Sequence, residues 1–108
     1  MENKENVIAA ASVYNEKYFI NPNFKNIPKK VLDEIQFLCI STAKELHCIF
    51  TMGFKTNGDI YFTTQGDSTD KIYREDFAEE TVTKIINEKS DLIKSLNLWY
   101  KVFVLKEV

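Results

Sequence analysis

Arginine, histidine and glycine are scarce in this sequence of 108 residues, which contains Arg74, His47 and three glycines. Arginine is the usual bidentate donor to phosphates and base edges, and the net charge is −2. Nucleic acid is therefore not expected as a partner, because binding it needs a basic excess. Three glycines also cannot supply a glycine-rich phosphate loop.

Cysteine is scarce too, and its two copies show no metal-binding pattern. Cys39, His47 and Cys48 match no zinc spacing, and structural zinc needs four ligands. We therefore expect no metal and no cofactor, and interpret both cysteines as reduced, buried thiols of a cytoplasmic protein. Residues 1–6 are polar, and the apolar run 7–13 is too short and unflanked for a secretory signal or a membrane span, so no membrane contact is expected.

No catalytic residue is predicted from the remaining polar groups. A cysteine beside a histidine can form an activated thiolate, but the adjacent side chains of His47 and Cys48 project in different directions. No third group lies at a recognisable spacing to orient the histidine. The acidic residues of 67–70 suit an ordinary turn, and those of 75–80 suit the start of a helix.

The strongest structural signal is the stretch 48–65, where two runs of aromatic and β-branched residues flank Asn57-Gly58. A three-residue loop over 56–58, with Gly58 in a left-handed conformation, pairs Phe54 with Ile60. This register is preferred because it gathers the large apolar side chains on one face, and a slip of one residue would exchange the faces. The shared apolar face then contains Phe50, Met52, Phe54, Ile60 and Phe62. In the same register, Gly53 lies under the ring of Tyr61.

The first half of the chain predicts a second hairpin and a helix. Runs 7–14 and 17–21 form strands that turn at Asn15-Glu16, although the three alanines of the first run also suit a helix. A helix over 28–46 begins with Pro28 in its first turn. Its apolar stripe consists of Val31, Leu32, Ile35, Leu38, Cys39, Thr42, Ala43 and Leu46. Phe37 and Ile40 lie off this stripe, which suggests a second contact surface.

The C-terminal third has helical periodicity from Asp76, which is the predicted N-cap, with Glu79 completing a capping box. A helix of about 28 residues, roughly 42 Å long, would overhang a domain of this size. Three alternatives stay open: a projecting helix, a kink near Ser90-Asp91, or a helix ending at Asn97 with a strand over 98–104. A long, kinked helix is favoured. Residues 71–74 suit either a short strand or a loop.

Lys89 interrupts the apolar stripe of this C-terminal segment. The simplest interpretation is a lysine whose stem crosses the rim of the core while its ammonium group reaches water. An alternative is that the stripe becomes an intersubunit groove there, with Lys89 facing a carboxylate of the partner. A catalytic lysine is the least favoured interpretation.

Together these elements predict a single α+β domain over residues 1–108. Its two antiparallel hairpins form one sheet, with the helix 28–46 and the C-terminal helix from 76 packed on one face in the order ββαββα. By analogy this order is similar to a trimmed profilin-like or roadblock-like architecture, whose members often dimerise.

Two sets of residues carry a resemblance. They are the segment 18–24 followed by Ile27-Pro28, with Ile49-Phe50-Thr51 and Asn57-Gly58, and the ending around Trp99-Tyr100. The chain resembles an uncharacterised family of short proteins from anaerobic Gram-positive bacteria over about residues 7–105. This resemblance implies no activity and no catalytic residue.

The functional expectation is a non-enzymatic interaction or regulatory module that self-associates, most simply as a homodimer, or binds an unidentified protein partner. Its basis is a surplus of apolar side chains, since aromatic residues are the usual interface anchors. The candidate interface residues are Phe37, Ile40, Lys89, Trp99, Tyr100 and Phe103. The alternatives are a small-ligand or sensing domain with a pocket near Tyr61, Tyr73 and Lys89, and a thiol enzyme using His47 and Cys48.

Overall fold

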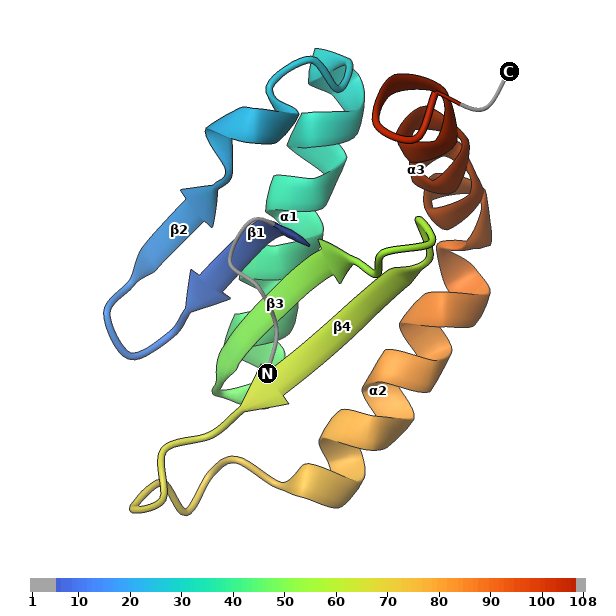
Figure 1. The fold of residues 1–108 in the computed structure, drawn as a ribbon. Helices are drawn as coiled ribbons and strands as arrows, with labels where there is room; N and C mark the ends of the chain where they lie inside the picture. Colours follow the sequence, from blue (N-terminus) through green and yellow to red (C-terminus); the bar gives the residue numbers. More distant parts are fainter. Residues whose placement is uncertain (1–5, 107–108) are drawn as a thin grey trace.

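The computed structural model describes residues 6–106, in which four strands and three α-helices follow the order ββαββαα. The elements are β1 (Val7–Ser12), β2 (Lys17–Ile20), the short 3-10 helix η2 (Pro22–Phe24), α1 (Lys29–Leu46), β3 (Ile49–Phe54), β4 (Ile60–Gln65), α2 (Glu75–Glu88) and α3 (Ser90–Phe103). The strands form one antiparallel sheet in the order β2-β1-β3-β4, and the helices pack against it (Figure 1). The predicted α+β class and both hairpins are confirmed.

The hairpin of β3 and β4 has the register that its side chains predict. Phe54 pairs with Ile60, and Gly58 has a φ angle of 94°, in the left-handed region that favours glycine. Gly53 pairs with Tyr61, and a Cβ atom on Gly53 would lie 2.5 Å from the tyrosine ring. The apolar face of this hairpin is the helix-covered face, where Phe50, Met52 and Phe54 are fully buried.

The alanines of β1 belong to a strand, which settles the ambiguity of the first run. Ala9 and Ala11 are buried on the helix side of the sheet, where β1 makes its contacts with α1. Small side chains let a helix approach a strand closely, so tertiary packing outweighs the helical preference of alanine here. A register shift between Val7 and Ala9 bends the strand where it pairs with β3.

The helix α1 follows its predicted stripe. Pro28 is the residue immediately before the helix, and the connection from β2 is anchored by the buried side chains of Phe24 and Ile27. The buried residues of the helix are Ile35, Leu38, Cys39, Thr42, Ala43 and Leu46. Val31 and Leu32 are partly buried at its first turns.

The C-terminal third forms two helices, so the prediction of a kink is confirmed and the projecting single helix and the strand over 98–104 are both wrong. The break falls at Lys89, whose φ and ψ angles of −106° and 27° are not helical, next to the predicted Ser90-Asp91. Residues 71–74 belong to a loop. The predicted cap Asp76 is also wrong: α2 begins at Glu75, and the Asp76 carboxylate accepts a hydrogen bond from the Phe77 N–H.

The described chain is elongated, with extents of 47, 28 and 26 Å. The end of α3 lies beside the β2–α1 connection at one end of the long direction (Figure 1). The loop between β4 and α2 and the first turns of α2 lie at the other end.

Candidate functional site

Three loops meet in a cluster formed by Tyr14, His47 and Asp70. Tyr14 follows β1, His47 ends α1, and Asp70 lies in the loop between β4 and α2. One carboxylate oxygen, Asp70 Oδ2, lies 2.7 Å from the Tyr14 hydroxyl and 2.5 Å from His47 Nδ1. The Tyr14 hydroxyl also lies 2.9 Å from the His47 carbonyl oxygen and accepts a hydrogen bond from the Asp67 N–H at 2.9 Å. The cluster therefore ties three segments that are distant in the sequence.

The charges of this cluster favour an ionised Asp70. The hydrogen bonds from Tyr14 and then from His47 hold the pKa of the Asp70 carboxyl well below its usual range. The pKa of Tyr14 is raised, chiefly by desolvation and then by its hydrogen bond to Asp70. His47 has a φ angle of 58°, the left-handed conformation of a helix C-terminus, which turns the chain from α1 into β3.

An oriented imidazole is half of a nucleophilic dyad, but the neighbouring thiol does not complete one. Asp70 is the orienting third group that the sequence spacing did not reveal, since it lies 23 residues after His47. Cys48 is fully buried in the core, and burial raises the pKa of its thiol to about 11. A thiol with this pKa is protonated near neutral pH and is a poor nucleophile. The arrangement fits a structural clamp between loops better than a catalytic pair.

The second cysteine is equally unreactive. Cys39 is fully buried in α1, and desolvation raises the pKa of its thiol to about 12. Both cysteines are free thiols, as the sequence predicts. Among residues 6–106, no group of three or more histidine, cysteine or acidic side chains is placed to hold a metal ion. None of the helices described here is both long and apolar enough to cross a membrane.

An apolar groove lies between the start of α1 and the second half of α3, and we call it the α1–α3 groove. It has a volume of about 390 Å³ and is lined by Ile27, Pro28, Val31, Ser95, Leu96, Leu98, Trp99, Val102 and Phe103. Leu98 and Phe103 are 63% and 62% exposed, although both are large apolar residues. Exposed apolar residues that line a groove together are typical of a contact surface.

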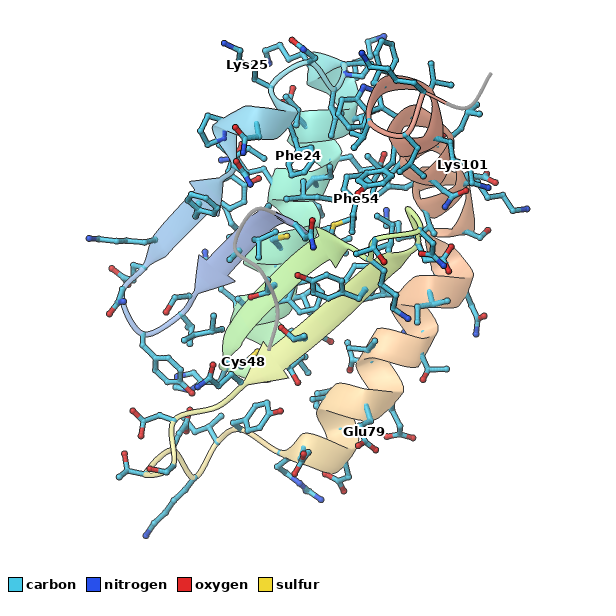
Figure 2. The ribbon with its side chains drawn as sticks, in the orientation of Figure 1. Phe24, Lys25, Cys48, Phe54, Glu79 and Lys101 are labelled. Atoms are coloured by element: carbon cyan, nitrogen blue, oxygen red, sulfur yellow. The ribbon has the colours of Figure 1, made fainter. Side chains whose placement is uncertain are left out.

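The floor of the α1–α3 groove is an aromatic stack that continues into the core. Trp99 is stacked with Phe54, with ring centroids 6.2 Å apart, and also with Phe103, with ring centroids 5.5 Å apart. Phe54 in turn contacts Phe24 and Tyr100 (Figure 2, where Phe24 and Phe54 are labelled). Trp99 Nε1 is buried with no acceptor among the described residues. The groove therefore has a rigid base, because its wall belongs to the packed core.

The candidate interface residues are distributed over several surfaces. Trp99 and Phe103 line the α1–α3 groove, while Phe37 is 73% exposed on a second groove between α1 and α2. Ile40 is partly buried against the core. Tyr100 is buried against Phe54 and is not available to a partner.

Lys89 has a role that the sequence did not reveal. Its ammonium group lies 3.4 Å from Glu34 of α1, so the carboxylate that it faces belongs to its own chain. Both side chains are more than one-third exposed, which makes this a weak surface ion pair. The position of Lys89 between α2 and α3 explains why it interrupts the apolar stripe.

The three residues expected around a ligand pocket do not gather. Tyr61 pairs with Gly53 and lies on the sheet face opposite Phe54, Ile60 and Phe62. The Tyr73 hydroxyl lies 2.9 Å from Thr64 Oγ1, and Lys89 lies at the groove between α1 and α2. A ligand site formed by Tyr61, Tyr73 and Lys89 together has no geometric support.

The fold and its exposed groove define a small α+β protein with one helix-covered sheet. The chain belongs to a family of unknown function, DUF6145, whose model matches residues 5–108. This match confirms the resemblance to an uncharacterised family, and the bacterial source that the resemblance implies stays an expectation. No curated protein and no solved structure matches the chain, so the profilin or roadblock analogy remains a comparison of element order.

Proposed function

We propose that this protein is a non-enzymatic interaction module that associates with further copies of itself, with a dimer as the smallest assembly. The single observation that carries the proposal is the exposure of Leu98 and Phe103 beside Trp99 in the α1–α3 groove. Large aromatic and aliphatic side chains gathered in a groove are typical anchors of protein interfaces.

Burial of Leu98 and Phe103 alone does not exceed the cost of association, so a complex needs further contacts around the groove. Complete burial of a large apolar side chain contributes about 1.5–3 kcal/mol, so burying the exposed parts of Leu98 and Phe103 gives about 1–2 kcal/mol each. Association costs at least about 4 kcal/mol in lost translational and rotational freedom. The partner must therefore bury further apolar surface in the groove. We expect a dissociation constant in the micromolar range rather than a permanent complex.

Size-exclusion chromatography with light scattering tests the proposal. The wild-type protein at about 100 µM is expected to give a mass of at least twice 12.6 kDa. Phe103→Asp places a charge in the groove and is expected to give the monomer. Phe19→Asp is the control, because it changes an exposed phenylalanine on β2 that lines neither the α1–α3 groove nor the groove between α1 and α2.

A wild-type protein that stays monomeric at about 1 mM contradicts the proposal, because that concentration far exceeds a micromolar dissociation constant. If Phe37→Asp loses association while Phe103→Asp keeps it, the contact surface is the groove between α1 and α2 and not the α1–α3 groove. Circular dichroism of each variant separates a lost contact from a lost fold.

A further inference from the structure

Six lysines lie in the two chain segments that border the α1–α3 groove. Lys29 and Lys30 lie between groove residues Pro28 and Val31, and Lys25 precedes them. On α3, Lys94 and Lys101 lie four residues before and three residues after Leu98, a spacing that places all three on one helix face. Segments 25–34 and 94–106 contain six lysines against Asp33 and Glu34, and Lys29 is paired with Asp33 at 2.9 Å. Figure 2 shows Lys25 and Lys101 at the same end of the molecule. We call this the basic end.

The opposite end has the opposite charge. Segment 67–80 contains six acidic residues against Lys71 and Arg74, and Arg74 is paired with Asp76 at 3.2 Å. The first turns of α2 are the most acidic part, and Glu79 lies at the far end from Lys25 and Lys101 in Figure 2. The acidic residues of this segment are Asp67, Asp70, Glu75, Asp76, Glu79 and Glu80. We call this the acidic end.

The acidic end also carries exposed apolar side chains. Ile72 is 66% exposed in the loop before α2, and Phe77 is 44% exposed in the first turns of the helix. Glu80 lies three residues after Phe77, so an acidic side chain neighbours the phenylalanine on the same helix face. One end of the molecule thus has an apolar groove bordered by lysines. The other has two exposed apolar side chains among acidic residues, and Phe77 also borders the groove between α1 and α2.

We infer that the occupant of the α1–α3 groove is the acidic end of a second copy of this chain, with Ile72 and Phe77 entering between the lysines. This inference rests on the proposed self-association and specifies its geometry. The groove volume of about 390 Å³ has room for an aromatic side chain. Charge complementarity fixes the orientation, because a groove placed against another groove would bring two basic rims together.

The contact is heterologous, since it joins two different surfaces of the same chain. Each added copy leaves one basic end and one acidic end free. The two ends lie at opposite extremes of the 47 Å dimension, so assembly continues head to tail beyond the dimer. The average mass is therefore expected to rise steadily with protein concentration.

Two variants that each block one end test the inference. Phe103→Asp blocks the groove and leaves the acidic end intact, whereas Phe77→Asp blocks the acidic end and leaves the groove intact. Each variant alone is expected to be a monomer by sedimentation velocity. An equimolar mixture is expected to give a heterodimer of about twice 12.6 kDa that does not grow further, because its two free ends are both blocked.

The charge contribution is tested in the wild-type protein. Raising the salt concentration from about 0.05 M to 0.5 M is expected to weaken assembly about fivefold or more, since the Debye length falls well below 10 Å. Lys101→Glu is expected to weaken assembly by a similar factor. If circular dichroism shows that either aspartate variant is unfolded, Leu98→Asp replaces the groove variant and Ile72→Asp replaces the acidic-end variant.

The results separate this inference from the proposed function. If the wild type assembles but Phe77→Asp and Ile72→Asp assemble equally well, the head-to-tail contact is wrong and self-association stands. A mixture that stays monomeric also overturns the head-to-tail contact. A wild type that is monomeric at about 1 mM overturns both proposals. A capped heterodimer from two monomeric variants supports both.

Discussion

Replacing Phe54 with alanine is the most demanding test of how the groove is built. Phe54 is fully buried and contacts three aromatic rings, with centroids of Phe24, Tyr100 and Trp99 at 5.3, 4.5 and 6.2 Å. These contacts join the η2 connection, β3 and α3, so one side chain supports the floor of the groove. Phe54→Ala is expected to reduce the free energy of unfolding by about 3–5 kcal/mol, through lost transfer energy and the cavity left behind.

That loss is a large part of the total stability of about 5–15 kcal/mol expected for a domain. For a chain of this length it corresponds to a fall in Tm of roughly 15–30 °C. Urea unfolding followed by circular dichroism measures it. Trp99, the sole tryptophan, supplies a local measurement, because its fluorescence should shift towards that of a solvated indole when the stacked ring is removed.

Phe19→Ala is the matched control for this substitution. Phe19 is on β2 and is 49% exposed, so its removal is expected to cost about 1 kcal/mol or less and to leave the Trp99 fluorescence unchanged. A Phe54→Ala protein as stable as Phe19→Ala would refute the reasoning, because it would show that the aromatic stack does not hold α3 against the sheet.

Three further substitutions or treatments test other contacts. Gly53→Ala is expected to destabilise the protein by about 1–3 kcal/mol, because the new Cβ would lie 2.5 Å from the Tyr61 ring. Urea unfolding measures this cost, and part of it should disappear when the same substitution is made in a Tyr61→Ala protein. Asp70→Asn is expected to destabilise the protein at pH 7. The pKa of the Asp70 carboxyl is lowered in the folded protein, so ionised Asp70 contributes stability above the ordinary pKa of 3.8. This contribution is lost as the pH falls through the lower pKa of the folded state. The difference in urea midpoint between wild type and Asp70→Asn should therefore shrink as the pH is taken well below 3.8, and a constant difference would contradict the assigned pKa direction. Neither Cys39 nor Cys48 should react with a disulfide reagent within minutes at pH 8 in the native protein, whereas both should react in urea; rapid native labelling would contradict their burial.

The features predicted correctly from the sequence are those that depend on neighbouring residues. The register of the hairpin around Asn57-Gly58 follows from the turn and from the alternation of side chains, which both act over a few residues. The stripe of α1 follows in the same way from helical periodicity. In both cases the local preference and the final packing agree.

The features that were missed depend on segments brought together by folding. Tyr14, His47 and Asp70 come from three loops, and no spacing in the sequence indicates that one carboxylate binds the other two side chains. The N-cap of α2 is Arg74 and not the predicted Asp76. Asp76 lies inside the helix, where its carboxylate accepts a hydrogen bond from the adjacent N–H of Phe77. A capping pattern in the sequence predicts a helix start to within a residue or two.

The exposure of the C-terminal aromatic residues could not be predicted from periodicity alone. Trp99, Tyr100 and Phe103 share one helical stripe, yet Tyr100 is buried and Phe103 is mostly exposed. Which of them faces the core depends on the rotation of α3 about its axis, and that rotation is set by the break at Lys89 and by the position of Phe54. The sequence thus indicates the residue types of a contact surface without separating its members from the core.

Net charge is a poor guide to the partners of this protein, because the value of −2 is an average over a basic end with six lysines and an acidic end with six carboxylates. Charges more than about 10 Å apart are screened from one another at physiological salt, so an approaching molecule responds to the nearer end. The two ends of this chain lie along a dimension of 47 Å and therefore act independently. A chain with an acidic end and a basic end has a complementary surface on every other copy of itself. For the same reason, its assembly should respond to salt much more strongly than its small net charge suggests.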